Sequence, residues 1–133
     1  MVDKEKGVSN TVFETSTFIN ILLGVYLAWF LYRRFAPVRG VKHITTTKLK
    51  SELNSKNHQF IDVRTPSEFQ ANRINGFKNI PLHELQKRAN ELSKEKEVFV
   101  ICQSGMRSSK ASKILKKLGF EHITNVKGGM SAW

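Results

Sequence analysis

The sequence predicts an α/β domain built on an open parallel β-sheet flanked by helices and preceded by one transmembrane α-helix. Two observations carry this prediction: an uncharged apolar segment lies near the N-terminus, and short apolar runs alternate with helix-like segments from residue 41 onward. With 133 residues, the chain has room for one domain and an appendage. We expect four parts: a polar tail at residues 1–11, a transmembrane helix at 12–34, a linker at 35–40 and the domain at 41–133.

The composition narrows the classes of function. Lys and Arg total 22 against 11 Asp and Glu, which gives a net charge of +11. A basic protein suits nucleic acid, anionic lipid or an anionic substrate, but the sequence contains no nucleic-acid reading motif, so we expect no nucleic-acid partner. A single cysteine excludes an intrachain disulfide and a CxxC metal site, and the four histidines lack ligand spacing. We therefore expect no metal.

Residues 18–32 form the apolar segment that we expect to cross a membrane. Extending the helix back to Val12 gives 21 residues, about 32 Å at 1.5 Å per residue, which matches the ~30 Å hydrocarbon core. Tyr26, Trp29 and Tyr32 gather toward its far end, as in an interfacial aromatic belt. A soluble core helix would be amphipathic, whereas this segment is apolar on every face. A cleaved signal peptide fits poorly, because no small-residue cleavage site follows the apolar run.

Basic residues near the two ends of this helix predict its orientation. Two lysines precede it, and six Lys or Arg residues follow it by residue 50. By the positive-inside rule, the N-terminus lies outside and the domain lies in the cytosol of a bacterial cell. A reducing cytosol also keeps a free thiolate intact. Membrane lipid is thus an expected partner, contacted by residues 12–34.

The domain alternates between strand-like and helix-like segments. The pattern predicts strands at residues 41–44, 59–63, 77–80, 97–101 and 122–126. It predicts helices from a cap at Thr46 or Thr47 to about residue 53, and at residues 66–71, 81–92 and 107–118. Thr65 and Glu68 form a capping box around Pro66 for the second of these helices. Strands separated by helices imply βαβ units and a parallel sheet.

The only cysteine, Cys102, follows the strand at 97–101 and precedes the helix at 107–118. A short loop from strand into helix turns several N–H groups inward, and the first turn of the helix adds unpaired donors and the positive end of its dipole. These donors stabilise an anion, so they favour a thiolate, the form that attacks sulfur and other electrophiles. Gly105 permits the backbone angles that the loop needs, and Arg107 adds a fixed charge. The alternative is that Cys102 is a small core residue at a strand end.

This loop resembles the active-site loop of the rhodanese (sulfurtransferase) family, in which a cysteine after a central strand is followed by a five-residue backbone cradle. The resemblance also covers residues 60–69, 74–82 and 126–133, in the order of the family. It implies a rhodanese-like fold with Cys102 as the catalytic residue. The substrate-binding cradle would consist of Gln103, Ser104, Gly105, Met106 and Arg107.

Three further residues are expected at the site: Arg64 is expected to bind substrate, and Asp62 and Ser108 are expected to support the site. Asp62 and Arg64 lie at the carboxyl end of a strand, the edge where open α/β sheets place their sites. In the family that the chain resembles, the matching pair borders the pocket; the alternative is a structural ion pair. Arg107 either orients an anionic donor or pairs with a carboxylate, and Ser108 either helps the cradle or only begins the helix.

Two features near residue 130 complete the expected site region. Gly128 and Gly129 are expected to let the backbone pass close to the active-site loop. Trp133 is expected in the core rather than in the site.

The sequence thus predicts a membrane-anchored sulfurtransferase without a cofactor. Its partners would be a small anionic sulfur donor, such as thiosulfate or a persulfide, and a thiol or cyanide acceptor, with a protein acceptor also open. Two alternatives stay open. One is a phosphatase or arsenate-reductase-like enzyme on the same fold, although such phosphatases have five residues between Cys and Arg and this chain has four. The other is a non-catalytic sulfur-carrier or docking module at the membrane.

Overall fold

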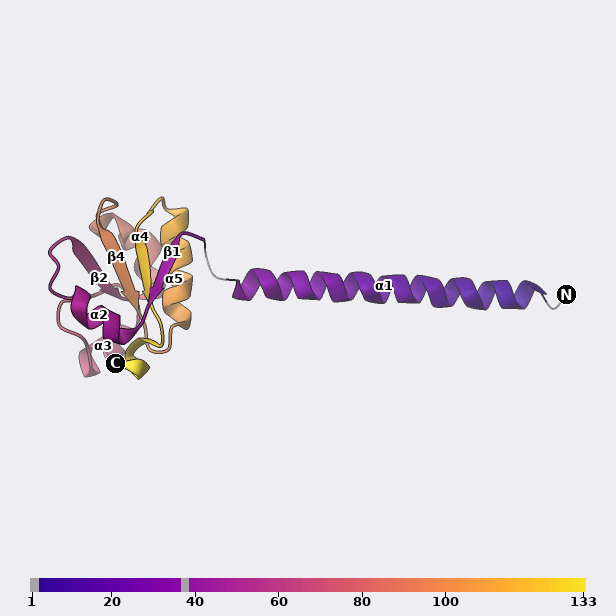
Figure 1. The fold of residues 1–133 in the computed structure, drawn as a ribbon, viewed down its shortest axis with the longest axis horizontal. Coiled ribbons are helices and arrows are strands. Elements are labelled where there is room, and N and C mark those ends of the chain that lie inside the picture. The colour runs from indigo at the N-terminus through magenta and orange to yellow at the C-terminus, as the bar shows by residue number, and fades with distance from the viewer. Residues whose placement is uncertain (1–2, 37–38) are drawn as a thin grey trace. The chain divides into compact units, whose positions relative to one another are not determined.

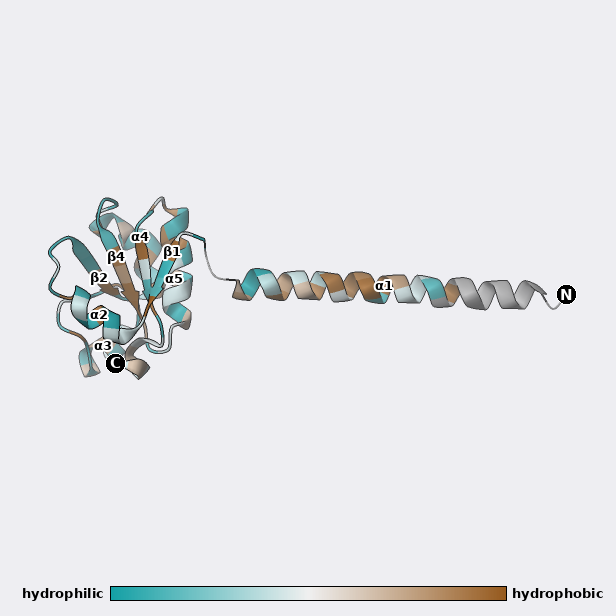
Figure 2. Cartoon of the chain, in the orientation of Figure 1, coloured by the Kyte–Doolittle hydropathy of each residue, from teal (hydrophilic) through white to brown (hydrophobic). Residues whose placement is uncertain are grey.

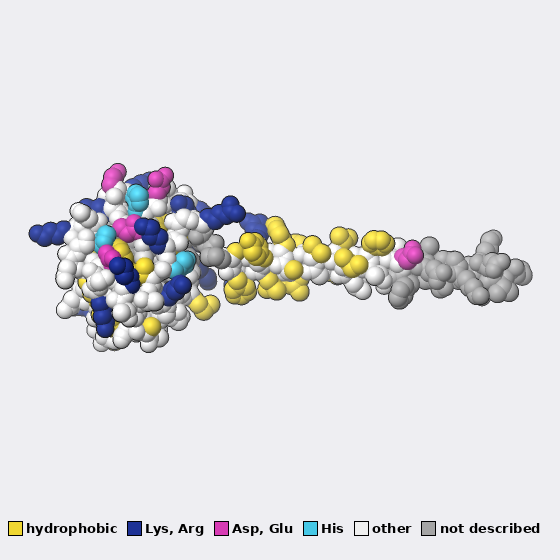
Figure 3. All heavy atoms as spheres, viewed as in Figure 1, with side chains coloured by type: hydrophobic (Ala, Val, Ile, Leu, Met, Phe, Trp, Pro, Cys, Tyr) yellow, Lys and Arg dark blue, Asp and Glu magenta, His cyan; other side chains and the backbone are white. Residues whose placement is uncertain are grey.

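The computed structural model describes residues 3–36 and 39–133 and divides the chain into two units, Met1–Pro37 and Val38–Trp133. The first unit holds one helix, α1 (Asp3–Phe35), so the polar tail expected at residues 1–11 is helical from Asp3 onward. Its 22-residue segment Glu14–Phe35 is long and apolar enough to cross a membrane, and none of it is buried. Apolar residues dominate this segment in Figure 2, and groups of hydrophobic side chains lie along the face that Figure 3 shows. Part of the linker expected at residues 35–40 lies outside the described residues.

The second unit is built on a five-stranded parallel sheet of order β1-β5-β4-β2-β3. The strands are β1 (Val41–Ile44), β2 (His58–Asp62), β3 (Lys78–Asn79), β4 (Glu97–Ile101) and β5 (Ile123–Val126). All five predicted strands are confirmed, although β3 has only two residues. The strand β4, which leads to the cysteine, lies at the centre of the sheet, because β5 and β2 pair with its two sides.

Helices cover both faces of this sheet (Figure 1). They are α2 (Thr46–Glu52), α3 (Pro66–Ala71), η1 (Leu82–Glu84), α4 (Leu85–Arg88), η2 (Ala89–Glu91), α5 (Met106–Lys117) and η3 (Gly129–Ala132). Alternation along β4 explains the two layers: Val98 and Val100 join the core cluster under α5, whereas Phe99 and Ile101 join the cluster that contains Leu49 of α2. Both faces of the sheet are therefore buried, as expected for a parallel sheet.

The single helix predicted at residues 81–92 is wrong. The segment forms a 3₁₀ turn, one turn of α-helix and a second 3₁₀ turn. Residues three apart align along a 3₁₀ turn. The broken helix thereby directs Leu82 and Leu85, and then Ala89 and Leu92, toward one core cluster.

Two predictions about individual residues are also wrong. The N-cap of α2 is Thr45, whose hydroxyl accepts a bond from Lys48 N at 3.2 Å, while Thr46 Oγ1 donates to the carbonyl of Ala132 at 2.9 Å. Trp133, expected in the core, is 42% exposed. Its ring lies on the surface, with Lys50 Nζ 5.2 Å from the ring centroid.

Candidate active site

Cys102 lies directly after β4, at the carboxyl edge of the sheet. Its side chain is completely buried and belongs to the core cluster on the α5 face. The alternative of a core cysteine is therefore partly right about its location. Its contacts nevertheless differ from those of an ordinary core cysteine, because Sγ lies within hydrogen-bond distance of a backbone N–H and of a hydroxyl.

The backbone N–H of Gly105 donates to Cys102 Sγ, with N 3.0 Å from the sulfur. Gly105, the residue before α5, has a φ of 103°. An L residue adopts this backbone conformation only with strain. The first helical hydrogen bond of α5 runs from Ser109 N to Gly105 O, at 3.1 Å. The preceding N–H groups of the helix therefore have no acceptor within it, and they supply the partial positive charge of a helix start. The structure thus brings Cys102 to a backbone cradle.

Ser108 contributes a second contact to the sulfur. Its Oγ lies 3.5 Å from Cys102 Sγ, and its hydroxyl donates to Gly105 O at 3.1 Å. Ser108 is completely buried, so this hydroxyl is a fixed part of the site. The Cys102 thiol donates to Ser108 Oγ while the Ser108 hydroxyl donates to Gly105 O, so a thiolate would accept the hydroxyl proton only if the hydroxyl turned away from Gly105 O.

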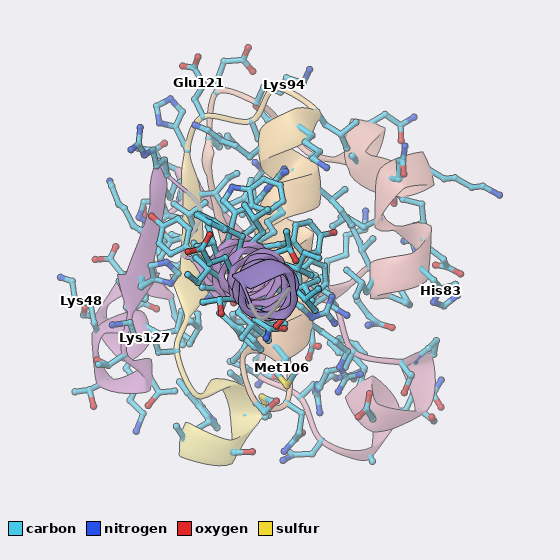
Figure 4. The ribbon with its side chains drawn as sticks, turned by 90° about the vertical axis from the view of Figure 1, so that its right-hand side faces the viewer. Lys48, His83, Lys94, Met106, Glu121 and Lys127 are labelled. Atoms are coloured by element: carbon cyan, nitrogen blue, oxygen red, sulfur yellow. The ribbon has the colours of Figure 1, made fainter. Side chains whose placement is uncertain are left out.

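The other cradle residues lie at the surface. Gln103, Ser104 and Met106 are exposed, and the Met106 side chain is 71% exposed. Met106 lies at the opposite edge of the domain from Lys94 and Glu121, which precede β4 and β5 (Figure 4). The cradle therefore opens at the carboxyl edge, where parallel sheets place their sites.

Asp62 and Arg64 form a buried ion pair beside the cradle. Both side chains are nearly inaccessible, and Arg64 Nη2 lies 2.7 Å from Asp62 Oδ2. Arg64 also donates to Asn72 O at 2.6 Å and reaches Gln103 Oε1 at 3.5 Å. The pair thus connects the end of β2 with the first cradle residue, which agrees with a supporting role.

Arg107 pairs with the carboxylate of Glu68 through two bonds, at 2.7 and 3.0 Å. The sequence left this alternative open, but it did not identify Glu68 as the partner. The Arg107 bonds, followed by those from Thr65, lower the pKa of Glu68 to about 2, and Glu68 in turn raises the pKa of Arg107. Glu68 was recognised only as a capping-box residue, a role that it also fulfils.

Sequence reasoning also missed Ser131. This residue, in η3, forms hydrogen bonds with Gln103 through both its N–H and its hydroxyl. The predicted close approach of Gly128 and Gly129 to the loop is confirmed for Gly129, because a Cβ at that position would overlap the carbonyl oxygen of Cys102. The repeated glycine was the sequence signal for this approach.

Within residues 3–36 and 39–133, no three His, Cys, Asp or Glu side chains are grouped so that they would hold a metal ion. The chemistry that this site offers is that of a sulfur nucleophile in contact with one backbone N–H group and one hydroxyl, at the start of a helix.

Several known proteins are similar to this chain over more than two thirds of its length. "Uncharacterized protein YqhL" of Bacillus subtilis is 35% identical over 116 residues, which are 86% of this chain and 92% of that protein. A "Putative sulfur carrier protein YrkF" of Bacillus subtilis is 38% identical over 71% of this chain, but this match spans only 51% of YrkF. A "Sulfurtransferase" of Allochromatium vinosum is 31% identical over 70% of this chain and 88% of that protein.

Solved structures agree with these relatives. A rhodanese-like domain protein from Staphylococcus aureus superposes with a TM-score of 0.64 at 38% identity, and the match covers 69% of this chain and 90% of that one. The model of the rhodanese-like domain family matches residues 45–133. The match covers more than half of the chain, including the whole cradle, so this protein belongs to the rhodanese-like domain family.

Proposed function

We propose that the protein is a membrane-anchored sulfurtransferase that moves sulfane sulfur through a persulfide on Cys102. The single observation that carries this proposal is the 3.0 Å hydrogen bond from Gly105 N–H to Cys102 Sγ at the start of α5. This N–H group is directed at the sulfur that would attack a donor, and the thiolate is the nucleophilic form of cysteine. The kinship with a named sulfurtransferase supports the assignment.

The reaction consists of two balanced steps. The Cys102 thiolate attacks the outer sulfur of thiosulfate or of a persulfide donor; a new S–S bond forms, the bond to the rest of the donor breaks, and sulfite or a thiolate leaves with the electron pair. A thiol or cyanide then attacks the outer sulfur of the Cys102 persulfide, the S–S bond breaks, and the Cys102 thiolate returns. One covalent intermediate between two half-reactions gives ping-pong kinetics.

The roles of the cradle residues follow from their positions. Backbone N–H groups of residues 103–107 hold the terminal sulfur of the persulfide, and the Ser108 hydroxyl turns from Gly105 O to donate to the charged sulfur of Cys102. Four residues between Cys102 and Arg107 make a smaller loop than phosphatases have, which favours a sulfur atom over a phosphoryl group. Arg107 supplies positive charge for an anionic donor, and the Asp62–Arg64 pair supports the loop.

The anchor in this proposal is the segment Glu14–Phe35. It spans about 33 Å as a helix, enough for one crossing of a bilayer. The basic residues that follow the helix favour a cytosolic domain and an N-terminus outside the cell.

Thiocyanate formation from thiosulfate and cyanide tests the activity. The wild type should give parallel double-reciprocal lines, and Cys102→Ser should give no thiocyanate. Ser93→Ala is a matched control, because Ser93 precedes β4 and its hydroxyl donates to Glu95, at the end of the strand opposite the loop. Activity that survives in Cys102→Ser would refute the assignment.

A sulfur-carrier role is a second candidate, favoured by the similarity to YrkF. A carrier accepts one sulfur and gives it only to its protein partner, whereas a sulfurtransferase turns over with small acceptors. Multiple turnovers with free thiols or cyanide favour the enzyme; one stable persulfide per chain without turnover favours the carrier.

A further inference from the structure

The C-terminal turn η3 lies directly against the active-site loop. Its residue Gly129 has a φ of 58°, and a Cβ there would overlap Cys102 O and the carbonyl group of Gln103. The turn is itself fixed to α2, because Thr46 Oγ1 donates to Ala132 O at 2.9 Å. The active-site loop therefore packs against the backbone of η3, and α2 holds this turn in place.

Hydrogen bonds from this turn hold two consecutive carbonyl groups of the loop. Met130 N donates to Cys102 O at 2.8 Å. Ser131 donates twice to Gln103 O, from N at 3.0 Å and from Oγ at 2.9 Å. The Gln103 side chain returns a bond, from Nε2 to Ser131 Oγ at 3.2 Å.

Because each peptide group is planar, a bond that fixes its C=O also fixes the direction of its N–H. In a trans peptide, the C=O and the following N–H point in opposite directions. With Cys102 O and Gln103 O directed toward η3, the N–H groups of Gln103 and Ser104 point away from η3. A peptide that lost its carbonyl partner would be free to rotate and to withdraw its N–H.

We propose that Ser131 is a positioning residue that holds the Gln103–Ser104 peptide so that its N–H faces the terminal sulfur of the Cys102 persulfide. Met130 does the same for the preceding peptide through its N–H. This inference deepens the proposed sulfur transfer and rests on it. Gln103 takes part twice, because its side chain joins Ser131 on one side and reaches Arg64 Nη1 at 3.5 Å on the other.

The test compares Ser131→Ala and Ser131→Thr in the full chain. Ser131→Ala removes the hydroxyl that both donates to Gln103 O and accepts from Gln103 Nε2, so kcat/KM for thiosulfate should fall about fivefold, the equivalent of one hydrogen bond. Ser131→Thr keeps a hydroxyl and should recover most of the lost rate. Ser51→Ala is the matched control, because Ser51 Oγ also donates to a main-chain carbonyl, Lys48 O at 2.7 Å, on α2.

A second readout separates positioning from mere stability. The rate at which iodoacetamide alkylates Cys102 follows the thiolate population, so its pH profile should move to higher pH in Ser131→Ala and stay unchanged in Ser51→Ala, at matched melting temperatures. This readout needs no sulfur donor. A wild type that forms no persulfide would refute the proposed function, whereas the alkylation profile still tests whether Ser131 sets the environment of the sulfur.

Two results would overturn the inference. One is a Ser131→Ala protein with the kcat/KM and alkylation profile of the wild type. The other is a loss of rate in Ser131→Ala that is matched by Ser131→Thr, because a hydroxyl-dependent role requires threonine to restore it.

Discussion

Arg107 of α5 and Glu68 of α3 are 39 residues apart in the chain, yet two hydrogen bonds of 2.7 and 3.0 Å join their side chains. The same carboxylate caps α3 through Thr65 N at 2.9 Å. Glu68 therefore connects the N-terminus of α3 to the first turn of α5, next to the cradle. This relationship leads to predictions about donor binding and about acid stability.

The first prediction separates the charge of Arg107 from its pairing. Arg107→Ala removes the guanidinium and should raise KM for thiosulfate several-fold, because the anion loses a fixed positive charge. Glu68→Gln leaves the guanidinium in place, keeps an amide for the cap and should leave KM close to that of the wild type. Steady-state kinetics over a range of thiosulfate concentrations measure both values. Equal increases in KM would mean that Arg107 acts only through its pair with Glu68.

The second prediction concerns stability in acid. In the folded protein the pKa of Glu68 is about 2, below its ordinary value of 4.5, because Arg107 and Thr65 bond to the charged form. A carboxylate with a lowered folded-state pKa contributes stability that is complete above the unfolded pKa and is lost as the pH falls through the folded one. The melting temperature should therefore drop between about pH 5 and about pH 2 more steeply in the wild type than in Glu68→Gln.

Glu121→Gln, at an exposed carboxylate, is the control for this pH series and should follow the wild-type curve. A Glu68→Gln curve as steep as that of the wild type would show that the Glu68–Arg107 pair contributes nothing to acid stability.

The third prediction concerns the buried pair of Asp62 and Arg64. The two side chains are only 1% and 3% exposed, so removing one leaves the other as an unpaired buried charge. Arg64→Ala should lower the free energy of unfolding by about 3–5 kcal/mol, measured by chemical denaturation. Arg88→Ala is the matched control; Arg88 is about one-third exposed and pairs with the partly exposed Glu84 and Glu91, so its loss should cost much less. Similar losses in both variants would contradict this account of the pair.

The fourth prediction concerns the apolar helix. The full chain should stay with the membrane fraction after an alkaline carbonate wash, and Leu23→Arg should weaken this retention, because arginine at the centre of a span costs about 2.5–3.5 kcal/mol. Protease added to intact cells should leave the domain uncut, since the domain is proposed to lie in the cytosol. Recovery of the wild type in the washed supernatant would refute the anchor.

The sequence predicted the parts of the fold that depend on local patterns. Apolar runs such as Val98–Ile101 identified the strands, and Thr65, Pro66 and Glu68 identified the start of α3, because capping chemistry is local. The segment after Pro81 was predicted as one helix, since its leucines have helical spacing. Burial against the sheet instead divides it into 3₁₀ and α turns, an effect of tertiary packing that periodicity does not record.

The sequence predicted the central residues of the site but not their long-range partners. Cys102 and its loop follow from the strand–loop–helix pattern and from the family resemblance. Two contacts of the site join residues that are distant in sequence and come together only in the folded domain. They are the pair of Glu68 with Arg107 and the pair of Ser131 with Gln103. No local pattern indicates such contacts, and the position of Trp133 at the surface was missed for the same reason.

The central claim, a persulfide on Cys102, is tested most directly by the intact mass of the protein after incubation with thiosulfate and again after addition of cyanide. We predict a gain of about 32 Da, one sulfur atom, that cyanide removes and that Cys102→Ser abolishes. No gain with either thiosulfate or a persulfide donor, or a gain that persists in Cys102→Ser, would contradict the account.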